Sequence, residues 1–107
     1  MKTPPKITKA TAYPDHIIEV IFDNDEKGKF NFENYFEYQG YYQFLNDISS
    51  FLKIKIHPQG NYVFWLNSQG EEIEIDPAIL YAICAKKPVI INNKIVFDPS
   101  LGKNAWI

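Results

Sequence analysis

The fold is decided by the stretch Phe51–Ala85, which reads FLKIKIHPQGNYVFWLNSQGEEIEIDPAILYAICA. Hydrophobic and polar residues alternate at 52–57 and 71–75, as they do in half-buried strands, whereas 62–66 is apolar on both faces. Glycine-containing turns separate these segments, and Asp76-Pro77 then has the features of a helix start. The stretch predicts a three-stranded antiparallel meander that leads into a helix.

The two turns predict how these strands pair. A three-residue loop at Pro58–Gly60 places Lys53 opposite Trp65, and a two-residue loop at Gln69-Gly70 places Trp65 opposite Glu74. Both loops give the same parity, so Trp65 is predicted to lie on the outer face. The residues expected on the core face are Leu52, Ile54, Ile56, Phe64, Leu66, Ile73 and Ile75.

This register predicts a candidate binding site. A tryptophan that is exposed among charges is typical of an interface anchor. The candidate partner-binding residues are Trp65, Lys53, Lys55, Glu72 and Glu74. The alternative is that the helix or the tail covers Trp65, because large aromatic side chains are mostly buried.

Residues 88–107 are expected to form a hairpin and tail that pack on a compact domain at 1–87 or on a partner. Val89–Ile91 and Ile95–Phe97 flank Asn92-Asn93-Lys94 and predict a hairpin that is apolar on both faces. Either this chain or a second chain would have to cover it, so a homodimer through the hairpin is a further hypothesis. The remaining tail is expected to be extended unless it docks.

Upstream of the central stretch, the pattern predicts another meander. Strands are expected at 6–12, 17–22 and 29–32, and a short helix at about 41–47. Aromatic residues crowd 35–45; they are interpreted as sealing one edge of the core, the alternative being a base-stacking platform. The predicted fold class is therefore α+β, a single small domain with a mostly antiparallel sheet in two meanders and one or two short helices.

Composition limits the function classes. The 107 residues are 46% hydrophobic and include one cysteine, which suits one domain without a disulfide scaffold. No apolar run is long enough to span a bilayer and no signal-peptide pattern opens the chain, so a cytoplasmic protein without membrane contact is expected. All eleven basic residues are lysines against thirteen acidic residues, which disfavours direct nucleic-acid binding because arginine is the main reader of guanine and phosphate.

The sequence offers no convincing catalytic or metal site. Asp23, Asp25 and Gly28 have the spacing of an EF-hand loop, but Lys27 takes a ligand position and strands flank the loop. The two histidines are interpreted as solvated turn residues without a nucleophile beside them. We therefore expect no metal, no cofactor and no enzymatic activity.

Several short segments, taken in order, resemble a known family. They are Pro5-Lys6-Ile7, Ile18–Asp23, Phe30-Asn31-Phe32, Gly40, Phe44–Asp47, Phe51, Gly60–Trp65 and Asp76–Tyr81. Together they resemble the small bacterial family known as domain of unknown function 2442, over roughly residues 3 to 83. The resemblance implies a compact α+β domain with a mostly antiparallel sheet.

The resemblance also carries expectations about function. Members of this family are often encoded beside another small protein, and some have an appended helix-turn-helix, which suggests toxin and antitoxin pairs. In this chain a hairpin and tail stand in place of that DNA-binding module. The expected function is a protein-interaction module, in its narrower form an antitoxin-like partner of a small toxin. The alternative is a nucleic-acid-associated regulatory domain that acts as an assembled oligomer.

Overall fold

A computed structural model describes residues 4–107; residues 1–3, which open the predicted unit 1–87, lie outside the described residues. Its first half is an antiparallel meander in the order β1-β2-β3, as predicted. The strands are β1 (Ile7–Ala12), β2 (Ile17–Phe22) and β3 (Lys27–Asn31). Their core-facing residues follow the predicted alternation, because Ile18, Val20, Phe22 and Phe30 are all buried. The sequence pattern was sufficient for this sheet.

The central stretch forms the second predicted meander, in the order β4-β5-β6, but with another register. The strands are β4 (Lys55–Ile56), β5 (Val63–Leu66) and β6 (Glu72–Glu74). Lys55 pairs with Phe64, and Phe64 pairs with Glu74. The predicted pairing is therefore wrong by one residue at both turns. Since side chains alternate along a strand, this slip moves each residue of β5 to the opposite face.

Each turn is one residue longer than predicted. In the first turn, His57 N–H donates to Tyr62 O at 2.9 Å, which leaves four residues in the loop, 58–61. In the second, Asn67 N–H donates to Glu71 O at 3.0 Å, which leaves three. The side chain of Asn67 holds this longer loop, because its Oδ1 accepts from the backbone N–H groups of Gln69 and Glu71, both at 2.9 Å.

Trp65 consequently lies in the core and not on the outer face. Its side chain is fully buried, and its Nε1–H donates to Phe51 O at 2.8 Å. Its ring stacks on that of Phe51 with centroids 5.9 Å apart. Leu52 and Leu66, both predicted to face the core, are instead 43% and 47% exposed.

Short helices connect the two meanders. They are the 3-10 helices η1 (Phe32–Asn34) and η2 (Gly40–Asn46) and the α-helix α1 (Ile48–Phe51). The predicted helix at 41–47 is confirmed as η2. The predicted strand at 52–57 is shorter at its start, because Leu52 and Lys53 belong to the turn that closes α1.

Two tyrosines of η2 cover the free edge of β6. The hydroxyl of Tyr41 accepts from Glu74 N–H at 3.0 Å, and the hydroxyl of Tyr42 donates to Glu74 O at 2.9 Å. Burial raises the pKa of Tyr42 well above its usual range, so the hydroxyl keeps its proton. The interpretation that the aromatic segment seals an edge is confirmed, and here it also satisfies backbone groups of an edge strand.

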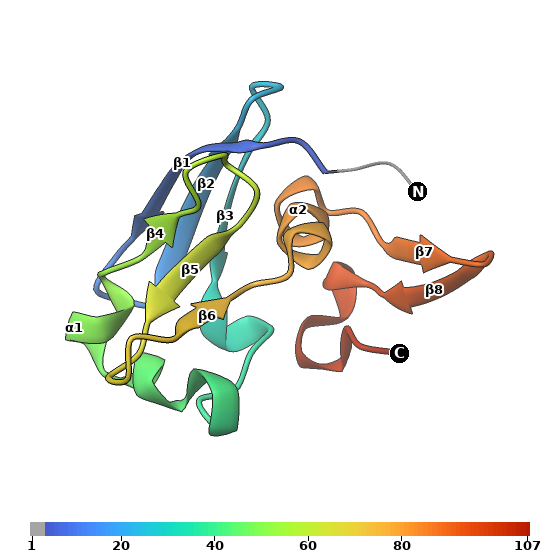
Figure 1. The fold of residues 1–107 in the computed structure, drawn as a ribbon. Coiled ribbons are helices and arrows are strands. Elements are labelled where there is room, and N and C mark those ends of the chain that lie inside the picture. Colours follow the sequence, from blue (N-terminus) through green and yellow to red (C-terminus); the bar gives the residue numbers. More distant parts are fainter. Residues whose placement is uncertain (1–3) are drawn as a thin grey trace.

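Helix α2 (Pro77–Ala85) follows β6, as predicted from Asp76-Pro77. Asp76 Oδ1 accepts from Ala78 N–H at 2.8 Å and from Ile79 N–H at 3.2 Å. The helix ends at Lys86, whose φ of 58° is in the left-handed region. Figure 1 shows α2 between the two meanders and the C-terminal hairpin.

The hairpin consists of β7 (Val89–Ile91) and β8 (Lys94–Phe97), followed by the 3-10 helix η3 (Pro99–Asn104). It projects from the rest of the molecule at the right of Figure 1. Its root is docked, because Phe97 and Ala105 are buried in the main core. Residues 4–107 thus form an α+β domain with short helices and three small antiparallel sheets, which confirms the predicted fold class.

Candidate interaction surface

The predicted binding residues do not form the predicted site. Lys55, Glu72 and Glu74 do share the outer face of β4–β6, but they lie opposite Leu66 and Phe64 instead of Trp65.

Lys53 lies outside the strands, in the exposed turn after α1. The candidate site of Trp65, Lys53, Lys55, Glu72 and Glu74 is therefore corrected. Trp65 is excluded because it is buried, and Lys53 is excluded because it lies in a turn outside the strands.

This outer face is largely closed by its own contacts. Phe64 is only 9% exposed, and the ring of Tyr62 packs on it edge to face at 5.9 Å. The Tyr62 hydroxyl donates to Glu72 Oε1 at 2.7 Å, and this hydrogen bond raises the pKa of Tyr62 to about 12. Leu66 on the same face is 47% exposed and has no such cover among the described contacts.

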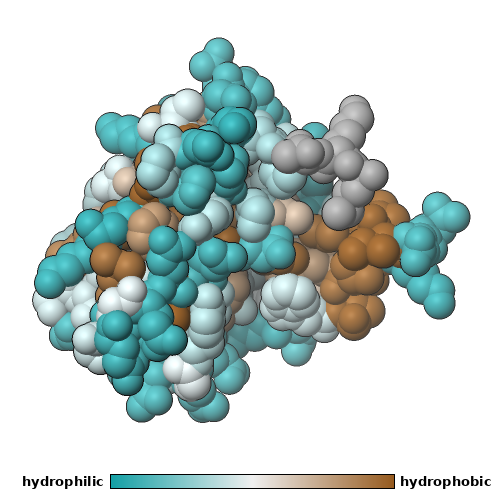
Figure 2. All heavy atoms as spheres, viewed as in Figure 1, coloured by the Kyte–Doolittle hydropathy of each residue, from teal (hydrophilic) through white to brown (hydrophobic). Residues whose placement is uncertain are grey.

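A larger apolar surface lies at the hairpin and the tail, and we call it the hairpin surface. Each of its six side chains is between 44% and 72% exposed: Ile90, Ile91, Ile95, Leu101, Trp106 and Ile107. Figure 2 shows hydrophobic atoms gathered over the hairpin, with hydrophilic atoms at its tip. The hairpin was predicted to be apolar on both faces, and the structure covers only its root.

The root of the hairpin surface is held by aromatic contacts. Trp106 forms a bridge with Phe97, and their rings meet edge to face at 4.9 Å. The Tyr35 hydroxyl donates to Pro99 O at 3.1 Å and joins η3 to the first half of the domain. The tail predicted to be extended unless docked is therefore docked, and it presents Trp106 half exposed.

The comparisons with known proteins identify a family. A family model described as "Protein of unknown function (DUF2442)" matches residues 7–86. The chain belongs to the DUF2442 family. No curated protein and no solved structure matches. The hairpin surface lies beyond the part of the chain that the DUF2442 match covers.

The acidic loop of the DUF2442 domain has no geometry for a metal. Glu26 Oε1 accepts from the amide of Asn24 at 2.7 Å and from the Tyr81 hydroxyl at 2.6 Å. Within residues 4–107, no three His, Cys, Asp or Glu side chains are placed to hold an ion together. The Glu26 carboxylate is thus occupied by contacts to its own neighbours. In the same described range, no helix is long and apolar enough to cross a membrane.

His16 differs from its interpretation as a solvated turn residue. Its side chain is 15% exposed, and its ring lies 4.6 Å from that of Phe51. Its Nε2 lies 3.0 Å from Leu45 O, and its Nδ1 lies 4.0 Å from Glu33 Oε1. The histidine therefore links the β1–β2 turn to η2 in the DUF2442 domain. His16 has a left-handed φ of 62°, which the sequence pattern did not indicate.

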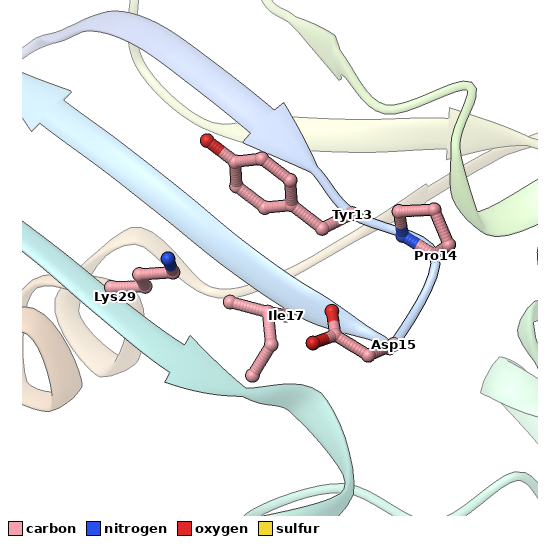
Figure 3. A pocket seen from close by; sticks show the side chains of 5 residues that line it. All are labelled: Tyr13, Pro14, Asp15, Ile17 and Lys29. Atoms are coloured by element: carbon pink, nitrogen blue, oxygen red, sulfur yellow. The ribbon is translucent and has the colours of Figure 1, made fainter.

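A shallow hollow of about 330 Å³ lies beside the β1–β2 turn. Figure 3 shows its lining, with Tyr13 from the end of β1, Ile17 from β2 and Lys29 from β3. The Lys29 ammonium lies 5.1 Å from the centroid of the Tyr13 ring, whose hydroxyl donates to Glu19 at 3.2 Å. The lysine and the tyrosine of the hollow thus already have contacts within the chain, and Asp15 also lines it.

Cys84 is expected to be unreactive and to make stability depend on pH. Burial raises the pKa of Cys84 to about 12, above its ordinary value of 9.0. Between these values the unfolded thiol loses its proton and the folded thiol keeps it, so stability falls as pH rises. At about pH 10.5 the loss is roughly 2 kcal/mol relative to pH 8.

Urea unfolding at the two pH values measures this loss of stability, and Cys84→Ala is the control. The variant should lose less stability than the parent, since it lacks the titrating group. Equal losses, or rapid reaction of the native thiol with a thiol reagent at pH 8, would contradict the buried environment.

Proposed function

We propose that this chain is a non-enzymatic protein-interaction module whose contact surface is the hairpin surface. The observation that supports this most is the exposure of six large apolar side chains on one short segment. Single exposed apolar residues are ordinary on proteins, whereas contiguous groups mark interaction sites. Within the hairpin surface, the paired residues Ile90 and Ile95 lie together on one face.

The arrangement of this surface is that of an interface with an apolar centre and a polar rim. Ile90 and Ile95 pair across the hairpin, and beyond them lie the turn Asn92-Asn93 and Lys94 at the start of β8. Trp106, 57% exposed and seated on Phe97, supplies a large, oriented aromatic side chain. Tryptophan is among the residues that contribute most at interface centres.

The narrower form of the proposal is an antitoxin-like partner of a small toxin, which is motivated by the DUF2442 assignment. Its support is physical: a partner that covers the hairpin surface removes apolar area from water, at roughly 25 cal/mol for each Å². The alternative, nucleic-acid regulation through an assembled oligomer, has no comparable support, because the exposed surface is apolar and all the basic residues are lysines.

The test is affinity purification of the tagged chain at endogenous level, in a host that also expresses an untagged copy. Ile95→Lys places a charge in the hairpin surface, and Leu52→Lys is the matched control, because Leu52 is 43% exposed and Ile95 is 44% exposed.

We expect a stoichiometric protein, either a second copy or another chain, with the parent and with Leu52→Lys, and its loss with Ile95→Lys. Binding that survives Ile95→Lys, or recovery of nucleic acid in place of protein, would contradict the proposal.

A further inference from the structure

Strand β7, which is three residues long and follows Pro88, is a sheet edge with which no further strand of residues 4–107 pairs. The edge of β6 is covered by Tyr41 and Tyr42, whose hydroxyls bond to Glu74. The outer side of β8 is covered by the tail, since Ile107 N–H donates to Val96 O at 3.1 Å. Such coverage is how proteins prevent sheet edges from pairing with other chains.

Charge does not protect β7 either. The edge strand β3 carries Lys27 and Lys29, and charged side chains on an edge oppose pairing. The sequence of β7 is Val89-Ile90-Ile91, which is uncharged and β-branched throughout. Strands of this composition pair readily when their edge is exposed.

The hairpin geometry indicates which backbone groups are free. Asn92 and Asn93 form a two-residue turn with φ of 52° and 63°, flanked by the pair Ile91 and Lys94. In such a hairpin the flanking pair points its backbone groups inward, and the next pair points them outward. That next pair is Ile90 with Ile95. The N–H and C=O of Ile90 therefore face away from β8.

We propose that a second copy of this chain pairs antiparallel with β7 about a two-fold axis at Ile90. The proposal rests on the proposed function and names the occupant of the β7 edge. Ile90 N–H of each copy donates to Ile90 O of the other, so one residue supplies two hydrogen bonds. A two-fold contact of this kind is self-complementary and closes at two copies, with the strand order β8-β7-β7-β8.

The side chains suit this arrangement. Ile90 and Ile95 share one face of the hairpin, so the four-stranded sheet would carry four isoleucines side by side. Ile90, Ile91 and Ile95 supply the exposed apolar side chains of the two hairpin strands, whereas the tail residues of the hairpin surface lie on the outer side of β8. An isolated two-stranded hairpin is marginally stable, so the added strands also stabilise it.

The first experiment measures the mass of the purified full chain by sedimentation or light scattering, from about 1 µM to about 500 µM. The chain mass is 12.5 kDa, and we expect a concentration-dependent shift to twice that value. Ile90→Pro removes the bridging N–H without touching the bonds inside the hairpin and should weaken dimerisation roughly 100-fold. Ile90→Val, which keeps the N–H and the β-branch, should dimerise like the parent.

The second experiment does not depend on the folding of the proline variant. Ile90→Lys and Ile90→Glu place like charges opposite each other in their own dimers, so each should be monomeric at low salt. Their equimolar mixture should dimerise, because lysine then faces glutamate across the axis. This rescue is specific for contact between the two copies of residue 90.

The outcomes separate the two proposals. A parent chain that stays monomeric, or a mixture that does not associate, overturns pairing at Ile90. If the parent is monomeric while Ile95→Lys abolishes the binding of another protein, the interaction module stands and the second copy is the wrong occupant. If neither a second copy nor another protein binds, both proposals fall.

Discussion

Replacing Trp65 with alanine is expected to lower the free energy of unfolding by about 3–5 kcal/mol, the range for removing a buried large aromatic side chain. The side chain of Trp65 is fully buried. Its ring stacks on that of Phe51 and meets that of Phe32 edge to face, with 5.9 Å between the ring centroids in each pair. Its removal leaves a cavity between the meanders and an unpaired carbonyl at Phe51. Urea unfolding followed by circular dichroism measures the loss.

The chain has its own matched control in the second tryptophan. Trp106 is 57% exposed, so Trp106→Ala should cost about 1 kcal/mol or less, since surface substitutions are mild. Trp65→Phe should fall between the two, because it keeps much of the ring but loses the bond from Nε1–H to Phe51 O. Similar losses of unfolding free energy for Trp65→Ala and Trp106→Ala would support the register predicted from the sequence, in which Trp65 lies on the outer face.

Replacing Gly28 with alanine is expected to cost about 3 kcal/mol, the upper end of the range for overpacking. A Cβ at this position would lie 2.4 Å from the Cβ and 2.5 Å from the Cα of Cys84. Strand β3 and helix α2 meet here, and both clashing atoms belong to or adjoin the helix backbone. The sheet and the helix would have to separate.

Two further variants show whether this clash is the cause. Adding Cys84→Ala should not rescue Gly28→Ala, because alanine keeps both the Cα and the Cβ. Gly70→Ala, at a φ of 76° with open space around the Cβ, should cost only the left-handed strain of about 1–2 kcal/mol. A smaller loss for Gly28→Ala than for Gly70→Ala, measured by urea unfolding, would contradict the close packing.

The turns explain why the first meander was predicted well and the second was displaced. His57–Gly60 and Asn67–Gly70 both place glycine as the fourth residue, and the Gly60 and Gly70 N–H groups donate to His57 O at 2.7 Å and Asn67 O at 3.0 Å. This is the pattern of a type I turn, with asparagine favoured first and glycine last. Counting Gly70 within the four-residue turn would have given the observed register of the second turn, whereas the loop of the first turn also includes Asn61.

The candidate site failed for the same reason. Lys55, Glu72 and Glu74 were correctly grouped on one face, because the one-residue slips at the two turns cancel between β4 and β6. Trp65 was grouped with them only through the pairing. A one-residue slip reversed β5 and left Phe64 and Leu66 on that face.

The sequence by itself determined the features that depend on neighbouring residues: two antiparallel meanders, the helix that begins at Asp76-Pro77, and an apolar hairpin with an asparagine turn. Their causes are local, in alternation, capping and turn conformation. Only the tertiary structure decided which face of β5 meets the core, how Tyr41 and Tyr42 protect the edge of β6, and that β7 is left without such protection. These depend on contacts between distant segments, which local patterns do not specify.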